Sequence, residues 1–401
     1  MSALPDIREI DVAGRTVLVR ADLNVPIRNG AVSDATRITR FAPTVVDLLD
    51  RGASVVVMTH LGRPGGEANA AYTVQPVADA LAREIGRGVA FVDDCVADAA
   101  GAGAEQLAQG RVLLLENLRF HKGEEKNDPD FARRLAVHGD IYVNDAFSCA
   151  HRAHASTHAI AALMPSYAGP SLLDEVAALT AALEEPRRPV AALVGGAKVS
   201  SKIAILENLA ARMDHLIVGG GMANTFIAAL GHNVGKSLCE TDCIELARNI
   251  MSVAAASKCR ILLPGDVVVA ASFEEDAPSL VVDVGEIPPD MMALDVGPRT
   301  VARIDAVLAE CRTLLWNGPL GAFETRPFGA ATFAVAREAA ALTEAGRLVT
   351  IAGGGDTAAA LAAAGVADRI SYLSTAGGAF LEWLEGRALP GIEILRNRTK
   401  R

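Results

Sequence analysis

The stretch VAALVGGAKVSSKI, residues 190–203, indicates the fold class of this chain. Five apolar residues come first, the pair Gly195-Gly196 follows at once, and a segment of helical composition then begins. An apolar run without polar alternation is typical of a strand that is buried on both faces, as in parallel sheets. A strand followed directly by a helix is also the connection that parallel strands need. The stretch therefore predicts an α/β fold with a parallel sheet.

The same pattern recurs along the chain. Apolar runs that we interpret as strands occupy residues 16–23, 53–60, 111–118, 140–147, 190–196, 214–221, 260–270, 313–319, 347–355 and 370–378. Segments with helical spacing lie between them, for example residues 73–86 and 199–213. This alternation predicts parallel sheets covered by helices on both faces, with ligands bound beyond the carboxyl ends of the strands.

Length and proline positions indicate two domains. A chain of 401 residues, 51% of them hydrophobic, is long enough for two substantial cores. The stretch at 169–189 has apolar residues at helical spacing, Pro170 near its start, and Pro186 and Pro189 at its end. We therefore expect a helix at 171–189 that connects a domain at 1–170 with a domain at 190–385.

Composition excludes several classes of partner. The net charge is −10 and the pI is about 5.4, which disfavours nucleic acid and acidic membranes as partners. The first residues lack an apolar core of signal-peptide length. Of six cysteines only Cys239 and Cys243 lie close in sequence, so reduced thiols are the better interpretation. We expect a cytoplasmic protein with no membrane or nucleic-acid partner.

Polar residues interrupt the first apolar strand near its end. In VLVRADLNVP, residues 17–26, strand alternation places Arg20, Asp22 and Asn24 on one face. Polar groups on a covered face favour a ligand site, whereas the alternative is an edge strand with one face in solvent.

Basic residues follow several of the predicted strands in the first half. His60 and Arg63 lie in THLGRP, Arg119 in ENLRFHKG, and Arg37 in DATRI. Each alone resembles an ordinary surface residue. Because the carboxyl ends of parallel strands meet at one edge of a sheet, together they predict an anion site.

The stretch VNDAFSCAHRAHASTH, residues 143–158, raises the choice between a metal site and an anion site. It contains Cys149 and the histidines at 151, 154 and 158, with Arg152 among them. A zinc site requires Cys and His side chains that converge in a closed ligand set, and Arg152 would repel a cation. We therefore interpret the stretch as an anion cradle.

The second half offers glycines instead of basic side chains. Glycine pairs follow four of its predicted strands, at 195–196, 219–220, 353–354 and 377–378. Bare backbone N–H groups at helix N-termini suit phosphate. Lys198 and Lys202, four apart at a predicted helix start, favour phosphate as well, although two solvated lysines would look the same.

Two acidic residues in this half have alternative interpretations. Asp356, in IAGGGDT, is either a helix N-cap or a ligand of Mg²⁺ on a nucleotide phosphate. Glu324, in WNGPLGAFE, either binds ribose hydroxyls or is simply exposed.

These motifs together resemble the phosphoglycerate kinase family. The blocks VLVRADLNVP, HLGRP, LLLENLRFHKGEEKND, VNDAFSCAHRAHAST, GGAKVSSKI, GGGMANTF, WNGPLGAFE and IAGGGDT occur in the family's order, and the likeness extends from about Ile7 to the end of the chain. It implies two Rossmann-like three-layer α/β domains with parallel sheets, joined by a helix and a hinge. The N-terminal domain would bind 3-phosphoglycerate or 1,3-bisphosphoglycerate, and the C-terminal domain would bind ADP or ATP with Mg²⁺. The tail at 386–401 would pack back on the first domain, and the protein would be a cytoplasmic, hinge-bending monomer of glycolysis.

The resemblance also assigns roles residue by residue. Substrate-binding positions would be Asp22, Asn24, Arg37, His60, Leu61, Gly62, Arg63, Arg119, His151 and Arg152. Nucleotide-binding positions would be Lys202, Gly297, Asn317, Pro319, Glu324, Gly354, Gly355, Asp356 and Thr357, with Asp356 also the metal ligand. Catalytic positions would be Arg37, Lys198, Gly377 and Gly378.

Two stretches depart from the family pattern. STAGGAFLE has Ala376 and Phe380 where the family often has Gly and Ser. AFSCAHRAH has Ser148 and Cys149 where the family often has Gly and Thr, which places a thiol near the expected substrate.

Two other functions are alternatives to this one. A nucleotide-dependent dehydrogenase would need a dinucleotide glycine fingerprint followed by an acidic residue, which the sequence lacks. The remaining alternative is a non-catalytic two-domain protein that binds nucleotide or phosphate.

Overall fold

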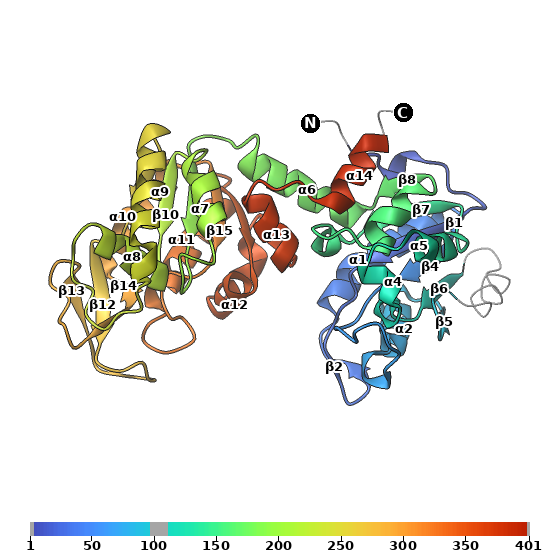
Figure 1. Cartoon of the computed structure of the whole chain (residues 1–401), viewed down its shortest axis with the longest axis horizontal. Helices are drawn as coiled ribbons and strands as arrows, with labels where there is room; N and C mark the ends of the chain where they lie inside the picture. The colour runs from blue at the N-terminus through green and yellow to red at the C-terminus, as the bar shows by residue number, and fades with distance from the viewer. Residues whose placement is uncertain (1–3, 97–110, 399–401) are drawn as a thin grey trace. The chain divides into compact units, whose positions relative to one another are not determined.

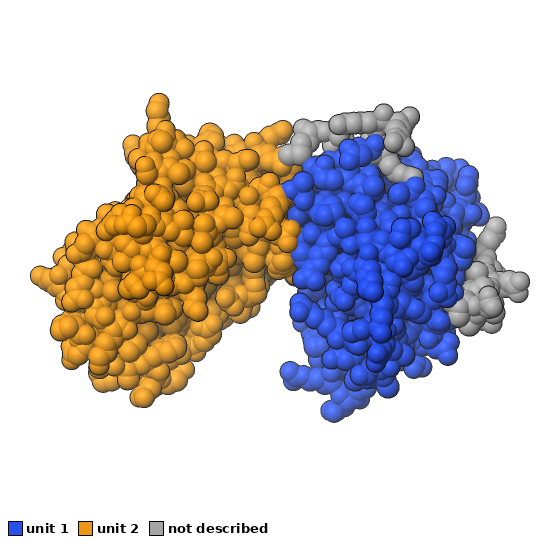
Figure 2. Space-filling view, in the orientation of Figure 1, with its two compact units in different colours: residues 1–176, 388–401 blue, residues 177–387 orange. Residues whose placement is uncertain are grey.

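The computed structural model describes residues 4–96 and 111–398 (Figure 1). The chain forms two compact units: residues 1–176 with 388–401, and residues 177–387 (Figure 2). The division between Val176 and Ala177 falls inside helix α6, Pro170–Leu183. Residues 1–3, 97–110 and 399–401, which belong to the predicted first domain and tail, lie outside the described part.

Unit 1 is built on a six-stranded parallel sheet. In spatial order the strands are β5 (Val89–Val92), β6 (Val112–Leu115), β4 (Ser54–Met58), β1 (Thr16–Ala21), β7 (Ile141–Asp145) and β8 (Ser166–Ala168). The α-helices of this unit besides α6 are α1 (Thr36–Asp50), α2 (Gln75–Ile85), α4 (Lys122–Glu125), α5 (Pro129–Ala136) and α14 (Pro390–Arg398). A short antiparallel pair, β2 (Ile27–Arg28) and β3 (Ala31–Val32), precedes α1.

Strand β1 lies in the middle of this sheet. It pairs in parallel with β4 on one side and with β7 on the other, and five of its six residues are buried. This excludes the edge-strand alternative for Arg20 and Asp22. After β1, the chain adds β4, β5 and β6 on one side of this strand and then β7 and β8 on its other side. The order in which strands are added therefore reverses beside β1. Loops separate at such a point, and α/β proteins bind ligands there.

Unit 2 is built on a second six-stranded parallel sheet. The spatial order is β11 (Arg260–Leu262), β10 (His215–Val218), β9 (Val190–Val194), β15 (Thr313–Asn317), β16 (Val349–Gly353) and β17 (Tyr372–Ser374). Counted along the chain within this sheet, the order is 3-2-1-4-5-6, as in Rossmann sheets. The α-helices here are α7 (Ile203–Ala210), α8 (Gly221–Ala229), α9 (Ile244–Ala256), α10 (Pro298–Glu310), α11 (Ala330–Glu344), α12 (Gly355–Ala363) and α13 (Gly377–Leu384). The predicted class of two three-layer α/β units with parallel sheets is confirmed.

The prediction of one strand at residues 260–270 was wrong. Strand β11 ends at Leu262, and a separate strand, β12 (Asp266–Ala270), begins after Pro264 and Gly265. Proline lacks the N–H that continues a ladder, so the apolar run breaks there. Strand β12 lies between β13 (Ser279–Asp283) and β14 (Met292–Val296) in a small antiparallel sheet that the sequence analysis missed.

The helix after β9 also begins later than expected. Helix α7 starts at Ile203, and Lys202 is its N-cap residue. Lys198 therefore lies in the preceding turns, so the two lysines do not share one helix face. Separate backbone conformations position their side chains.

The C-terminal helix α14 belongs to unit 1. The Gly391 N–H donates to the Ala150 carbonyl at 2.9 Å, in the segment that follows β7. A Cβ on Gly391 would lie 3.0 Å from the Ala150 Cα, so the two segments pack closely. Among the helices of the described residues, none is long and apolar enough to cross a bilayer.

Candidate active site

Asp22 links the segments that follow two neighbouring strands of unit 1, β1 and β7. It follows β1, and its Oδ2 accepts from the Arg37 guanidinium and from the Ser148 hydroxyl. Arg37 lies in the first turn of α1, and Ser148 follows β7. The carboxylate thus joins three segments where the chain reverses direction.

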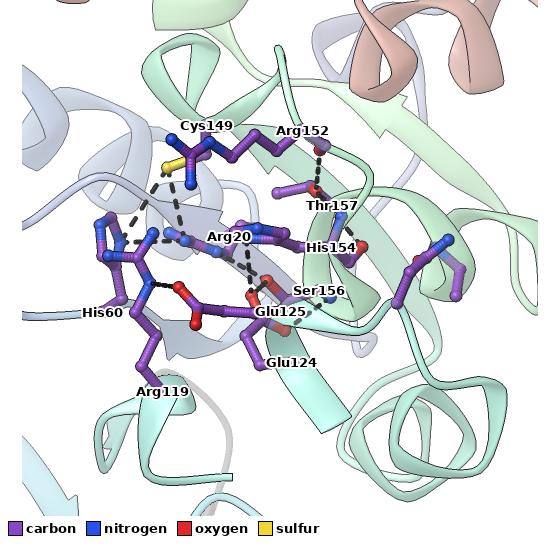
Figure 3. Close-up of polar contacts among 12 residues, drawn as sticks. Arg20, His60, Arg119, Glu124, Glu125, Cys149, Arg152, His154, Ser156 and Thr157 are labelled. Atoms are coloured by element: carbon purple, nitrogen blue, oxygen red, sulfur yellow. Dashed lines mark hydrogen bonds and ion pairs between the residues drawn. The ribbon is translucent and has the colours of Figure 1, made fainter. Parts of the chain in front are cut away.

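Arg20 is a buried cation at the centre of this site (Figure 3). Its side chain is 1% exposed, and its NH2 group lies 3.1 Å from the His60 Nδ1 and 3.5 Å from the Cys149 sulfur. Because a guanidinium only donates, the His60 Nδ1 must accept, and the ring proton resides on Nε2. Burial, followed by the charges of Arg20, Arg119 and Arg37, lowers the pKa of His60 well below its usual value. His60 is therefore a neutral hydrogen-bonding group.

A buried hydrogen-bond network holds the Arg20 side chain in place. Its Nε donates to the Ser156 hydroxyl at 2.9 Å, and that hydroxyl donates to Glu124 at 2.6 Å. Glu124 also accepts from the Ser156 N–H at 3.0 Å. Burial raises the pKa of Glu124, while Arg20 and the Ser156 bonds oppose that shift. The network fixes the direction of the Arg20 guanidinium.

Gly62 is hydrogen-bonded to two other predicted substrate-binding residues, Asn24 and Arg119. Its N–H donates to the Asn24 side chain at 3.0 Å, and its carbonyl accepts from Arg119 at 2.7 Å. Its φ is +61°, and a Cβ there would lie 2.4 Å from the Tyr72 ring, so only glycine fits. The neighbouring Leu61 is buried and anchored through its carbonyl by Asn117, at 2.8 Å.

The histidines of the stretch 143–158 do not converge on one point. His151 lies 3.3 Å from Arg152, His154 lies 3.9 Å from Glu124, and His158 lies 3.2 Å from Asn127. Each ring has a different neighbour, so a metal site made of these three rings is not formed. Burial, with Arg119, Arg20 and Arg152 next in effect, lowers the pKa of His154 to about 4. The cations that surround this stretch are arginines.

Arg63 and Arg152 are exposed, in contrast to Arg20. Arg152 acts on the titration of His154, as Arg119 and Arg20 do, so its charge belongs to the same cluster. Arg63 follows Gly62 in the loop after β4. An edge that carries several arginines is suited to a multiply charged anion.

The corresponding point in unit 2 lies between β9 and β15. Lys202 extends from the start of α7 to the Gly195 carbonyl, 2.9 Å away, and to the Asn317 carbonyl, 3.2 Å away. Burial lowers the pKa of Lys202 to about 8, and Asp356 opposes that shift. A Cβ on Gly195 would lie 1.8 Å from the Pro319 carbonyl oxygen, so the strand ends meet without room for side chains.

Strand β16 contributes a second group of backbone positions. Gly354 is the N-cap of α12 at a φ of +100°, and Gly355 and Asp356 are exposed at its first turn. The Asp356 side chain does not cap the helix, which removes the N-cap alternative. The Thr357 hydroxyl is buried and donates to the Gly353 carbonyl at 2.9 Å while it accepts from the Gly318 N–H at 2.7 Å.

The departures in STAGGAFLE are compatible with the fold. Ala376, the N-cap of α13, has a φ of −97°, which any residue adopts, so glycine is not required there. Gly377 and Gly378 remain exposed at the helix start. The Phe380 ring is buried against Gly353, where a Cβ would meet it at 2.8 Å. The two altered residues are buried, and the two glycines at the helix start stay exposed.

The other predicted nucleotide positions lie at the start of α10 and in the loop after β15. Gly297 caps α10 and packs against Asp266, whose carboxyl would lie 2.3 Å from an added Cβ. Pro319 is buried and Glu324 is exposed in the loop after β15. Gly297 therefore has a clear packing role, whichever ligand binds nearby.

Sequence reasoning missed several residues of these sites. Arg20 was noticed on the polar face of its strand but not as the cation at the centre of the unit 1 site. Ser156 and Glu124 were missed altogether, because they reach Arg20 from segments more than a hundred residues away. A charged residue inside an otherwise apolar strand is the signal that identifies Arg20.

Two doubly wound α/β units, one with an arginine-rich strand edge and one with glycine-lined strand ends, define a two-domain protein suited to phosphate groups. The phosphoglycerate kinase family model matches residues 7–387. The phosphoglycerate kinase of Methylorubrum extorquens strain PA1 is 55% identical over 98% of this chain and 99% of its own, and that of Methylobacterium radiotolerans is 57% identical over 96% of each. The solved structure of phosphoglycerate kinase from Coxiella burnetii has a TM-score of 0.92 and 41% identity, and covers 99% of this chain and 100% of its own. The chain belongs to the phosphoglycerate kinase family.

Proposed function

We propose that the protein catalyses reversible phosphoryl transfer between 1,3-bisphosphoglycerate and Mg-ADP, which gives 3-phosphoglycerate and Mg-ATP. This is the reaction of the family to which the chain belongs, and it makes the protein a glycolytic phosphotransferase with a carboxyl group as acceptor. The observation that carries the proposal is the cluster of Arg20, Arg37 and Arg119 around a neutral His60.

Unit 1 is the proposed site for the glycerate substrate. Arg119, Arg63 and Arg152 would bind its phosphate by charge-assisted hydrogen bonds, and the His60 Nε2–H and the Gly62 loop would add neutral donors. Asp22 and Asn24 would accept from the glycerate hydroxyl. Because arginine stays charged at all relevant pH values, this site would bind a dianion without needing a histidine proton.

Unit 2 is the proposed nucleotide site. Lys202 and the backbone N–H groups at the start of α12 would bind the phosphates, and Glu324 would accept from the ribose. The Asp356 carboxylate is exposed and close enough to Lys202 to affect its titration, so a single hard ligand is available beside the phosphate positions. Mg²⁺ in nucleotide sites commonly takes one or two carboxylates together with substrate phosphates, so the residues fit this ion. When bound, Mg²⁺ supplies neutralising charge on the phosphate oxygens.

The reaction needs positioning and charge neutralisation more than a covalent catalyst. The attacking atom is an oxygen that already carries negative charge, so no general base is needed. Arg37 and Lys198 would stabilise the transferring phosphoryl group, and the N–H groups of Gly377 and Gly378 would contribute from the start of α13. The two substrates would occupy different units, so we propose that a hinge between the units closes during turnover. We also propose that the protein acts as a cytoplasmic monomer.

A coupled assay that follows ATP formation from 1,3-bisphosphoglycerate and ADP tests the proposal. We expect turnover that depends on Mg²⁺ and on both substrates. Calorimetry would show binding of 3-phosphoglycerate and of the nucleotide to separate sites. Binding of both ligands without turnover would instead support a non-catalytic protein that binds nucleotide and phosphate.

A further inference from the structure

A second cluster of ligating side chains lies at the far edge of the unit 1 sheet. Asp94 and Cys95 follow the edge strand β5, and His121 follows β6. The His121 Nε2 lies 2.8 Å from the Asp94 Oδ1, and one donor atom from each of the three residues lies within 4.8 Å of the others. Neither the proposed substrate contacts nor the nucleotide contacts use these three side chains.

The spacing of these atoms suits a tetrahedral metal ion. Zn²⁺ binds N, O and S donors at about 2.0–2.3 Å, which places neighbouring ligand atoms about 3.3–3.8 Å apart. The Asp94 and His121 donors are closer than this, at 2.8 Å, and all three donors lie within 4.8 Å of one another, so small side-chain rotations would bring them to these separations. Asp94 and His121 are 33% and 29% exposed, whereas Cys95 is 1% exposed. A water molecule can therefore reach the fourth position from the solvent side.

Neighbouring contacts hold the ligands in place. The Asp94 Oδ1 accepts from the N–H groups of Cys95, at 2.6 Å, and Val96, at 3.2 Å. The His121 ring stacks on Phe131 with centroids 5.2 Å apart. The His138 Nε2 lies 3.1 Å from the Cys95 carbonyl, which anchors the backbone of that residue. Such outer contacts orient metal ligands and reduce the entropy lost on binding.

A similar triad at the substrate site provides an electrostatic comparison. Asp22, His60 and Cys149 also bring their donor atoms within 4.8 Å. There, Arg20 lies 3.5 Å from the thiol and Arg37 pairs with the carboxylate. Positive charge at such distances opposes a cation and favours an anion.

The Asp94 carboxylate contacts His121 and the backbone N–H groups of Cys95 and Val96, whereas Asp22 pairs with Arg37. The Arg134 guanidinium is directed to the Val96 carbonyl, 3.2 Å away. A carboxylate held by an imidazole and by backbone N–H groups keeps a negative charge that attracts a divalent cation.

We propose that Asp94, Cys95 and His121 form a site for a divalent transition-metal ion, with Zn²⁺ preferred and water as the fourth ligand. Thiolate and imidazole donors select Zn²⁺ over Mg²⁺, so the magnesium that the reaction needs does not compete. On binding, the thiol loses its proton to solvent and the His121 Nε2 lone pair faces the ion, with the ring proton on Nδ1. His121 lies two residues after Arg119, so the metal would stabilise the segment that carries this arginine.

Metal binding to the full-length protein tests the site. The chain would first be stripped with a chelator, in a background with Cys239→Ser and Cys243→Ser to remove the half-buried thiols. Competition with a chromophoric chelator should then show one tightly bound Zn²⁺ per chain. Loss of a ligand should cost at least as much affinity as loss of an outer contact, about 10- to 100-fold. We expect that loss in Cys95→Ser and in His121→Gln, while Cys149→Ala, in the matched triad, should bind Zn²⁺ as the background does.

Co²⁺ provides a direct readout of the thiolate. We expect a sulfur-to-cobalt charge-transfer band that is present in the background and in Cys149→Ala, and absent in Cys95→Ser. A band that survives Cys95→Ser, a band lost in Cys149→Ala, or no band at all would overturn the proposal. If the buried Cys95→Ser substitution prevents folding, the half-exposed His121→Gln variant decides. Wild-type affinity for Zn²⁺ in a folded His121→Gln protein contradicts the site.

Discussion

The NH2 group of Arg20 lies 3.1 Å from the Nδ1 of His60, and both side chains are buried at the carboxyl end of the unit 1 sheet. The arginine can only donate, so it selects the imidazole tautomer with its proton on Nε2. It also disfavours a second ring proton by charge. Arg20 thus fixes the protonation state and the tautomer of His60.

We expect His60 to stay neutral between pH 6 and pH 8. Burial and three arginines lower its pKa well below 6.5, so its ionisation occurs only at more acidic pH. Nitrogen-15 chemical shifts of the imidazole would identify Nδ1 as the acceptor and Nε2 as the protonated atom. A ring that titrates near pH 6.5 would contradict the proposed bond. Assignment of the signal would use the His60→Gln variant.

We expect Arg37→Ala to reduce turnover by about 100- to 1,000-fold, the usual cost of removing one transition-state charge contact. Arg37 is partly exposed, so folding should persist, as a thermal melt would verify. Arg40, exposed on the same helix, is the matched control, and Arg40→Ala should keep nearly normal turnover. If Arg37→Ala retains more than about half of the wild-type rate, the residue does not act on the transferring group.

We expect Arg152→Ala to weaken 3-phosphoglycerate binding more than His151→Gln does. The arginine charge is permanent and its fork can make two hydrogen bonds to phosphate. A charge-assisted bond contributes about 1.5–3 kcal/mol, so the loss should be roughly 10- to 150-fold. Sulfate, which does not titrate in this range, should compete with the substrate and bind equally well at pH 6 and pH 8 in the His151→Gln background. A steep loss of sulfate affinity over that range would show that another histidine supplies the charge.

We expect Asp356→Asn to weaken Mg-ATP binding and leave 3-phosphoglycerate binding unchanged. The side chain does not cap α12, so stability should change little. Calorimetry with each ligand separately, beside the exposed control Asp290→Asn in the same unit, measures the effect. Equal weakening of both ligands, or a large drop in melting temperature, would point to a structural role.

We expect Asp305→Asn to stabilise the protein at neutral pH. Burial and the charge of Glu338 raise the pKa of Asp305 to about 6, and its Oδ1 has no hydrogen-bond partner among the described residues. A carboxyl whose folded pKa lies above its unfolded value loses stability as the pH rises between the two. The variant should therefore melt about 1–3 °C higher than wild type at pH 7 and show no gain at pH 4. An equal difference at both pH values would show that the effect does not depend on charge.

The sequence by itself was sufficient for the class of fold and for the loops that carry ligand groups. Apolar runs such as residues 190–194 must be buried on both faces, and the residues that follow them must then lie at one edge of a sheet. Gly62 was assigned through the family resemblance alone, and only the folded chain shows that its left-handed backbone lies against the Tyr72 ring. Periodicity alone could not detect the break at Pro264, since the apolar residues continue on both sides of it.

Tertiary structure decided which groups meet and what charge each one carries. Ser156 and Glu124 reach Arg20 across more than a hundred residues of chain, and no local pattern encodes that contact. The two triads, Asp22–His60–Cys149 and Asp94–Cys95–His121, consist of the same residue types. Arg20 and Arg37 contact the first, whereas the carboxylate of the second contacts an imidazole and backbone N–H groups. Residue type determines which atoms can bind. The electrostatic potential at a site, which favours an anion or a cation, is the sum of contributions from all charged groups nearby in space. Only the folded chain determines which groups those are.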